Sequence, residues 1–476
     1  MARIDGAIGS TIESLVTAVH RRRLHRVGWA RALNPPAGDY ATAGPPPRAG
    51  NALEVLVDGA SAFAAMIAAI RGARSHVHVT GWHLNPDFVL DTQSPPTILR
   101  ELLSEAADGV NVRVLLWAGA PIRVFRPTRS DMRKVADRLG AGGRIKVALD
   151  ARERPMHCHH DKTVVVDDRI AFVGGIDLTD FGGNRLDSGK HPHRTSIGWH
   201  DAASRLEGPA VQDVAEHFRL RWSATTGESL PAPAVQAKAG EVELQVVRTV
   251  PDGMYDTLPK GDFSVLEAYG RALRSAERLI YLENQFLWSP EIMSVLRDKL
   301  RRPPTPGFRL VILLPQKPNS GGDDTRGQLR SLIDADAGAG RLLACSLVAP
   351  DGGSGTAVYV HAKIGIVDDR WLTLGSANLN EHSLFNDTEV NIVTADPAVA
   401  RATRIALWAE HLEVDAAEIS GDTTEVVDAI WKPTARGQLE RRRRGEPQTH
   451  RLVELEGASR RSGLLLGPIQ GLLVDA

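Results

Sequence analysis

The sequence is poor in cysteine, in aromatic residues and in lysine, and its charges almost cancel. Its 476 residues include two cysteines, 5% aromatic residues and 10 lysines, with a formal net charge of −1 at pH 7. Two cysteines are too few for a disulfide framework or a cysteine-based zinc site. The near-zero charge gives no bulk electrostatic case for a protein that coats nucleic acid, and so few aromatic residues offer little for stacking on bases.

Long hydrophobic runs are missing as well. The longest uncharged stretches, at 59–70 and 462–474, have 12 and 13 residues, whereas a membrane-spanning helix needs about 20. The N-terminus lacks a basic, apolar and small-residue cleavage pattern, so no signal peptide is expected. We therefore expect a cytoplasmic protein that would meet a membrane only at its surface.

The first 49 residues differ in pattern from the rest of the chain. Apolar residues recur at helical spacing up to Val19, and the basic run 20–26 follows. Such a helix either packs on its own domain, which is the favoured alternative, or lies on an anionic membrane surface. The stretch 34–47 is rich in proline, alanine and glycine and is typical of a linker.

From about residue 50 the chain repeats itself at a spacing of about 190 to 203 residues. The strand-like run 112–116 matches 308–312, and Gly208–Val211 matches Asp396–Val399, where each proline opens a helix. The predicted units are an N-terminal segment 1–49, a first lobe 50–228, a second lobe 240–435 and a C-terminal tail 436–476.

Each copy alternates strand-like and helical segments, which predicts the α/β class. We expect two α/β/α sandwich lobes related by a pseudo-twofold axis. Each lobe would contain a mostly parallel sheet, and the active site would lie at the interface between the lobes.

The strongest repeated element is the pattern His-x-Lys-x-x-x-x-Asp, which occurs at His160–Asp167 and again at His361–Asp368. Chance would supply roughly 0.02 such matches in this composition. Each copy is followed at the same distance by a turn of small residues, Gly174–Asp177 and Gly375–Asn378.

The spacing has a chemical meaning. Residues i and i+2 of a strand face the same side, so each motif projects a histidine and a lysine together. Two imidazoles with an ordinary pKa near 6.5 can divide the work of nucleophile and proton donor on a phosphodiester. Two lysines can neutralise the phosphate oxygens as charge builds on them, so no metal is required.

Two plainer interpretations of these histidines are weaker. A single histidine on a buried strand is most often a core residue, but a duplicated histidine–lysine pair is not. His157, His159 and His160 are clustered, yet adjacent and alternating positions do not make a recognised zinc-ligand set.

These residues make the chain similar to the phospholipase D superfamily, whose signature is this duplicated motif. The similarity covers about residues 50–430, and the chain most resembles the true phospholipases D. The segments that carry the resemblance are His159–Asp167, Gly174–Leu178, Trp199–Asp201, Glu207–Val211 and Tyr281–Phe286.

The resemblance implies a two-step mechanism through a covalent phosphohistidine, with no cofactor. It makes His160 the nucleophile, although the residues alone leave the two histidines equivalent. His361 would protonate the leaving alcohol and then activate water or an acceptor alcohol. The residues implied to bind the phosphate group are Lys162, Lys363, Asn378, Ser376 and Asp177.

The resemblance also implies a carboxylate downstream of each motif that orients a histidine. Glu389 fits that place after the second motif, and Asp187 fits it after the first. Asp167 and Asp368 lie farther along their strands and are expected to be structural supports.

We therefore expect a phospholipase D-type enzyme that hydrolyses glycerophospholipids or exchanges their head groups, with water or a primary alcohol as acceptor. The alternatives are a nuclease or other non-lipid phosphodiesterase, and a cardiolipin synthase-like phosphatidyltransferase. An inactive lipid-binding module is disfavoured because both motifs are intact. The segment 378–389 is shorter than in many phospholipases, and His382 stands where arginine is common, which bears on head-group preference. A chain with both motifs needs no partner to complete its site, so a monomer is expected.

Overall fold

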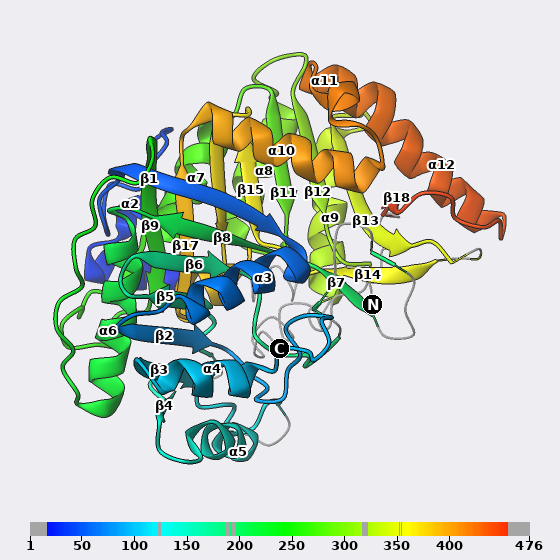
Figure 1. Cartoon of the computed structure of the whole chain (residues 1–476). Coiled ribbons are helices and arrows are strands. Elements are labelled where there is room, and N and C mark those ends of the chain that lie inside the picture. The colour runs from blue at the N-terminus through cyan, green and yellow to red at the C-terminus, as the bar shows by residue number, and fades with distance from the viewer. Residues whose placement is uncertain are drawn as a thin grey trace.

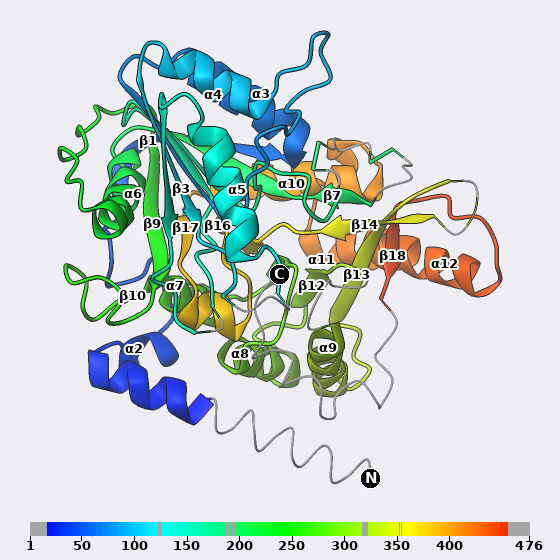
Figure 2. The same cartoon turned by 90° about the horizontal axis from the view of Figure 1, so that it is seen from below.

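The computed structural model describes residues 17–121, 125–155, 157–183, 185–186, 191–192, 197–316, 322–351, 353 and 355–455. Figures 1 and 2 show strands gathered in the middle of the molecule, with helices on the outside. Within the described residues, every helix is too short or too polar to cross a bilayer.

The first lobe contains seven strands of one sheet and the helices that cover it. Its elements are β1 (Arg48–Val57), α3 (Asp58–Arg71), β2 (His76–Gly81), α4 (Leu99–Ala107), β3 (Asn111–Trp117), α5 (Arg129–Gly140), β4 (Ile145–Asp150), β5 (Thr163–Val166), β6 (Ile170–Gly174), β7 (Gly198–His200), β8 (Ala202–Glu207) and α6 (Val211–Thr226).

The second lobe repeats this order and then continues. Its elements are β9 (Val242–Val250), β10 (Asp262–Phe263), α7 (Ser264–Ser275), β11 (Leu279–Glu283), α8 (Pro290–Arg301), β12 (Arg309–Leu313), α9 (Gly322–Asp336), β13 (Leu342–Ala349), β14 (Thr356–Val360), β15 (Ile364–Val367), β16 (Trp371–Gly375), η1 (His382–Asn386), β17 (Glu389–Thr394), α10 (Pro397–Leu412), η2 (Ala416–Ile419), α11 (Thr423–Val426), η3 (Val427–Trp431), α12 (Lys432–Arg443) and β18 (Leu452–Glu454).

The duplication is visible in the strand order of the two sheets. The first sheet runs β4-β3-β2-β5-β6-β8-β1, and the second runs β13-β12-β11-β15-β16-β17-β9. The two orders match strand for strand. The pair β1–β9 and the parallel pair β7–β14 join the lobes.

The expectation of a mostly parallel sheet is wrong. The pairings β2–β3 and β3–β4 are parallel, but β2–β5, β5–β6, β6–β8 and β8–β1 are antiparallel, and the second sheet follows the same plan. Part of the reason is the short turn at the end of each motif, between β5 and β6 and between β15 and β16, in which Asp167 and Asp168 both have positive φ, as do Asp368 and Asp369. Such a turn folds the strand back on itself as a hairpin.

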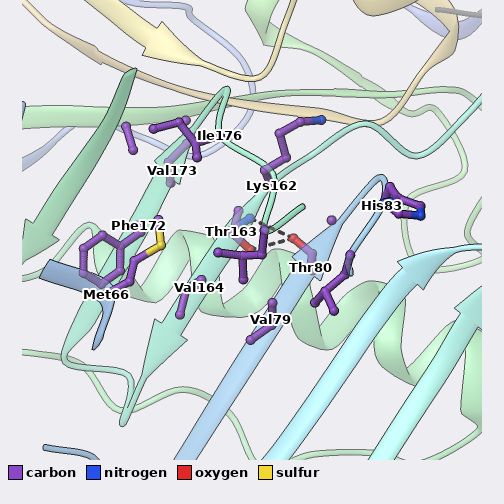
Figure 3. Close-up of a pocket in the computed structure, with 15 residues that line it drawn as sticks. Met66, Val79, Thr80, His83, Lys162, Thr163, Val164, Phe172, Val173 and Ile176 are labelled. Atoms are coloured by element: carbon purple, nitrogen blue, oxygen red, sulfur yellow. Dashed lines mark hydrogen bonds between the residues drawn. The ribbon is translucent and has the colours of Figure 1, made fainter. Parts of the chain in front are cut away.

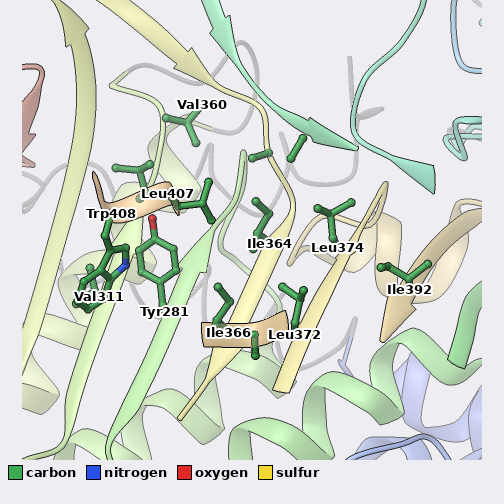
Figure 4. Close-up of a cluster of buried hydrophobic side chains, with 14 of the residues drawn as sticks. Tyr281, Val311, Val360, Ile364, Ile366, Leu372, Leu374, Ile392, Leu407 and Trp408 are labelled. Carbon is green, nitrogen blue, oxygen red and sulfur yellow. The ribbon is translucent and has the colours of Figure 1, made fainter. Parts of the chain in front are cut away.

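The two sheets pack against each other through one shared apolar core. Side chains from both lobes meet there, including Val165 and Val173 from the first and Ile364 and Ile366 from the second, and Figure 4 shows the part built by the second lobe. The helices α6 and α10 contribute to the same core. A separate core under α3 and α4 covers the outer face of the first sheet. Another under α7, α8 and α9 covers the outer face of the second, and Figure 2 shows these two helical layers on opposite sides of the strands.

The described part of the N-terminal segment packs on the second lobe. The helix at residues 17–27 buries Leu24 in the core under α7, and the short helix α2 (Ala30–Leu33) lies beside α7. At the other end of the chain, β18 pairs with β13 and so extends the second sheet to Glu454.

Candidate active site

The two motifs meet at the interface between the lobes. Each histidine–lysine pair stands directly before a strand, β5 or β15. The backbone N–H of His160 donates to Thr388 O in the second lobe at 2.9 Å, and that of His361 donates to His200 O in the first lobe at 2.8 Å. Each motif is therefore hydrogen-bonded to a segment of the other half of the chain.

His160 is oriented by Glu389. Its Nδ1 donates to the Glu389 carboxylate, with Oε1 at 3.0 Å and Oε2 at 3.2 Å. The hydroxyls of Ser376 and Ser383 each donate to this carboxylate at 2.5 Å. Burial raises the pKa of Glu389, while the nearby His160 and Lys162 act to lower it. Ser376, expected to bind phosphate, instead donates to the carboxylate that holds the histidine.

His361 is oriented by Asp201, which lies between β7 and β8. Its Nδ1 donates to Asp201 Oδ2 at 2.6 Å. Burial raises the pKa of Asp201 to about 6. Burial, with the charges of Lys363, Arg185 and Lys162, keeps the pKa of His361 well below 6.5.

The two carboxylates are thus exchanged between the lobes. Glu389, which follows the second motif in sequence, serves the histidine of the first motif, and Asp201 serves the histidine of the second. Because Nδ1 of each ring is occupied, Nε2 is left for the substrate. Asp187, predicted for the second carboxylate, lies outside the described residues. Asp201 was missed in that role, although the segment Trp199–Asp201 carries part of the family resemblance.

Both lysines are buried, and each donates to the backbone carbonyl of the histidine in its own motif, while their second partners differ. Lys162 Nζ donates to its own motif's His160 O at 2.8 Å and pairs with Asp177 Oδ2 at 3.1 Å. Lys363 Nζ donates to His361 O and to Gln285 Oε1 at 3.1 Å.

Asp177 and Asn378 occupy matching places after the two motifs. Asp177 pairs with Lys162 and accepts the Trp82 N–H at 3.1 Å, so its negative charge faces a lysine. Asn378 Nδ2 donates to Gln285 Oε1 at 3.5 Å. Gln285 is thus shared by Asn378 and Lys363, and sequence reasoning had not singled it out for a role.

A small cavity lies beside Lys162 in the first lobe (Figure 3). It is lined by apolar side chains from α3, β2, β5 and β6, among them Met66, Val79 and Phe172. Lys162 is the one residue of the lining that carries a full positive charge.

The last residue of each motif ties its hairpin to the neighbouring strand. The Asp167 carboxylate accepts the backbone N–H groups of Arg74, Ser75 and His76 at 2.8 to 3.0 Å. Asp368 accepts those of Glu277, Arg278 and Leu279, at the start of β11, at 2.7 to 2.8 Å. Neither carboxylate contacts a motif histidine among the described residues.

The three clustered histidines have different partners. His157 contacts His382 and Asp387, His159 contacts Thr388 and Asp150, and His160 contacts Glu389. They do not converge on one point. Other groups of histidine and carboxylate side chains place one possible metal-binding atom from each residue within 4.8 Å of the others.

Comparisons with known proteins agree with this geometry. The family model described as "Cardiolipin synthase, PLD-like domain" matches residues 269–408. Phospholipase D A of Dictyostelium discoideum is 26% identical over 76% of this chain and 35% of its own length. Phospholipase D2 of Bos taurus is 25% identical over 74% of this chain and 50% of its own length.

A bacterial relative and a solved structure extend the comparison. The major cardiolipin synthase ClsA of Bacillus subtilis is 25% identical over 74% of this chain and 67% of its own length. The crystal structure of phosphatidylserine synthase from Haemophilus influenzae Rd KW20 superposes with a TM-score of 0.53 at 14% identity, over 76% of this chain and 87% of that one. That likeness concerns the fold. The chain spans 35% and 50% of the two phospholipases D named above. Taken together, these matches support the phospholipase D superfamily as the group of proteins that this chain resembles.

Proposed function

We propose that the protein is a phospholipase D-type phosphodiesterase, which hydrolyses or transphosphatidylates glycerophospholipids through a covalent phosphohistidine. The observation that carries the proposal is the pair of exchanged contacts, His160 with Glu389 and His361 with Asp201. Two oriented imidazoles with two lysines beside them suit the transfer of a phosphoryl group between two alcohols or an alcohol and water.

In the first step, Nε2 of His160 attacks phosphorus and the P–O bond to the head-group alcohol breaks. His361 donates a proton to the departing oxygen, so the alcohol leaves neutral. The Glu389 carboxylate stabilises the positive charge that develops on His160. Lys162 and Lys363 stabilise the negative charge on the phosphate oxygens.

The substrate itself prepares His361 for this role. The cations around His361 hold its pKa well below 6.5, so the ring is neutral in the free enzyme. A phosphodiester carries one negative charge, and its binding between the lysines offsets those cations. That raises the pKa of His361 and favours its protonated form, as the ionised Asp201 does also.

In the second step, His361 acts as the base. It takes a proton from water or from an acceptor alcohol, whose oxygen attacks phosphorus as the bond to His160 breaks. Water gives phosphatidic acid and an alcohol gives a new phospholipid. Exclusion of water around the intermediate decides between the two outcomes.

A lipid substrate is supported by the relatives, which are named as phospholipases D and a cardiolipin synthase. The match to a cardiolipin synthase domain favours a second candidate of the same chemistry, a phosphatidyltransferase that uses a lipid alcohol as acceptor. A nuclease or another non-lipid phosphodiesterase would use the same residues. It has less support, because the charges of the chain nearly cancel.

One incubation tests the proposal. Purified protein is mixed, without added metal, with phosphatidylcholine, phosphatidylethanolamine and phosphatidylglycerol vesicles plus ethanol, and the lipids are read by mass spectrometry. Phosphatidylethanol is expected, and the depleted lipid identifies the head group. Cardiolipin as the main product would favour the second candidate. No change in any lipid, together with cleavage of single-stranded DNA or of a simple phosphodiester, would refute a lipid substrate.

The nucleophile is tested by trapping. Rapid acid-free denaturation after mixing with lipid, followed by peptide mass spectrometry, is expected to show a phosphatidyl adduct on the peptide that contains His160. An adduct on the His361 peptide would reverse the two roles.

A further inference from the structure

Behind the His361–Asp201 pair lies a cluster of buried histidines and carboxylates that the proposed reaction does not use. Its members come from the start of α3, from the segment before β7, from β7, from β11 and from the end of α10. They are Asp58, His191, His200, Glu283, Glu410 and His411. The side chains of five of them are at most 1% exposed, and that of Glu410 is 14% exposed.

Four of these side chains surround one point. His191 Nε2 lies 3.1 Å from Glu410 Oε1 and 3.3 Å from Asp58 Oδ2. His200 Nδ1 lies 3.1 Å from Asp58 Oδ1 and 3.5 Å from Glu410 Oε1. The four donor atoms, one from each residue, all lie within 4.8 Å of one another.

Hydrogen bonds account for this arrangement only in part. Asp58 Oδ2 accepts no hydrogen bond from the described residues, although Asp58 is fully buried. Glu410 Oε1 is faced by ring nitrogens of three histidines, with His411 Nδ1 the farthest at 3.9 Å. Nor does an arginine or lysine of the described residues pair with Asp58 or Glu410. A buried carboxylate is costly unless a positive charge balances it, so Asp58 and Glu410 depend on protonated histidines or on a bound cation.

The side chains that contact these four residues also have an arrangement that is common around metal sites. His200 presents Nδ1 to the cluster and donates from Nε2 to Glu283 Oε2 at 2.8 Å. Glu283 in turn accepts from His411 Nε2 at 3.0 Å and from the Tyr281 hydroxyl at 2.5 Å. A histidine that binds a metal commonly donates its other ring N–H to a carboxylate, which fixes the ring and raises its basicity.

We propose that Asp58, His191, His200 and Glu410 form a structural site for a divalent transition metal, with zinc as the ion that fits best. Zinc is held by imidazole nitrogens and carboxylate oxygens at about 2.0–2.1 Å, which separates tetrahedral donors by about 3.4 Å. The four separations between histidine nitrogens and carboxylate oxygens, measured to either oxygen of Asp58, are 3.1 to 3.5 Å and bracket that value. Two carboxylates and two neutral imidazoles carry a charge of −2, which the ion balances.

The site would stiffen the catalytic centre without taking part in the reaction. Asp58 Oδ1 accepts the backbone N–H of Asp201 at 3.1 Å, and the Asp58 N–H donates to Asp201 O at 2.8 Å. Asp201 holds His361. A metal on Asp58 and His200 therefore fixes the backbone from which that carboxylate projects.

The competing explanation is an all-protein ion network. In it, the carboxylates raise the pKa of His200 well above 6.5, and protonated imidazoles alone balance the charge. The two explanations differ in metal content, which can be measured without any substrate. The outcome is therefore independent of whether the proposed phosphodiesterase activity is found.

The full chain should be purified without a histidine tag and without chelator, and its metals measured by inductively coupled plasma mass spectrometry. About one zinc ion per chain is expected. His191→Ala and Glu410→Ala are each expected to fall below about a tenth of that content, since each removes a ligand. His450→Ala, at an exposed histidine far from the cluster in sequence, should keep the wild-type content.

A second measurement uses the wild-type protein alone, so it tests the proposal even if the variants fail to fold. Chelator-treated protein is reloaded with Co²⁺, which in a tetrahedral site absorbs strongly in the visible range, and then titrated with Zn²⁺ to remove the signal. An equimolar end point is expected, together with a melting temperature that falls on chelation and recovers on reloading. Wild-type protein that contains no metal and takes up neither ion would overturn the proposal, as would His191→Ala and Glu410→Ala proteins with wild-type metal content.

Discussion

Glu389 of the second lobe accepts the Nδ1–H of His160 of the first lobe at 3.0 Å. This contact crosses the lobe interface, and its counterpart, Asp201 with His361, crosses it in the other direction. Neither lobe therefore supplies both a motif histidine and the carboxylate that orients it. The duplicated fold becomes a single chemical unit only when the two sheets are packed together.

Replacement of Glu389 by glutamine should abolish most activity and leave binding largely intact. The amide keeps the size of the side chain but removes the charge that stabilises the His160 imidazolium. We expect kcat to fall by about 10²-fold or more, with a much smaller change in KM. Glu446→Gln, at a carboxylate distant from the site, is the matched control. A loss confined to KM would show that Glu389 acts on substrate binding instead.

Asp201 predicts a specific pH dependence of stability. Its folded pKa of about 6 lies above its ordinary value of 3.8 because the carboxyl is buried. The folded state therefore binds the proton more tightly, and the free energy of unfolding decreases as pH rises from about 4 to about 6. Above about pH 6, the buried and ionised Asp201 lowers the free energy of unfolding by about 3 kcal/mol in total. Asp201→Asn should remove this decrease, so melting curves of the two proteins from pH 4 to 7 should differ most in slope over that window.

The enzyme activity should change with pH in the opposite direction to the stability: it should increase as Asp201 loses its proton. Only the ionised carboxylate can both accept the His361 N–H and favour its protonated ring, so kcat/KM of the wild type should fall as pH drops below about 6. Asp201→Asn should lower kcat/KM at every pH and lose this dependence. A variant with the wild-type profile would show that another group causes the acid limb.

A substitution at Gly175 would test the contact between Asp201 and His361 by steric displacement. A Cβ at this position would collide with the Asp201 carboxylate. The corresponding residue of the second lobe is Ser376, whose hydroxyl donates to Glu389. Gly175→Ala should therefore displace Asp201 and reduce kcat by about ten- to a hundredfold. Gly437→Ala, on α12 where the Cβ meets open space, should leave kcat unchanged. Equal kcat in the two variants would contradict the argument.

Much of this arrangement can be predicted from the sequence, because the motif and the repeat can both be read directly from it. The His-x-Lys spacing predicts which side chains share a face, and the repeat predicts two similar lobes. Spacing cannot reveal which lobe a carboxylate serves, since that depends on how the sheets pack. Glu389 was therefore expected near the site with no assigned histidine. Asp201 was overlooked, because a carboxylate outside both motifs has no spacing that marks it.

The strand directions show a different limit. Strands alternating with helices favour a parallel sheet, and β2, β3 and β4 obey that rule. The pair Asp167-Asp168 breaks it, because aspartate tolerates positive φ and allows a tight turn. Two consecutive aspartates after a strand indicate a hairpin. The prediction of a parallel sheet relied instead on the alternation of strand-like and helical segments.

Arg23 links the N-terminal helix to the turn that contacts Glu389. Its guanidinium pairs with Asp252 and donates to Asn386 Oδ1 at 2.7 Å and to Phe385 O at 2.9 Å, both at the end of η1. Ser383, in the same turn, donates to Glu389 at 2.5 Å. Arg23 is thus a positioning residue for Glu389.

Arg23→Ala should reduce kcat several-fold through loss of the hold on η1, with KM for lipid vesicles little changed. The neighbouring Arg22→Ala is the matched control, because Arg22 is exposed on the same helix. If this helix served instead to attract anionic membranes, both variants would raise KM on phosphatidylglycerol-rich vesicles and neither would alter kcat. Steady-state kinetics on anionic and on neutral vesicles therefore separate a helix that positions Glu389 from one that binds lipid.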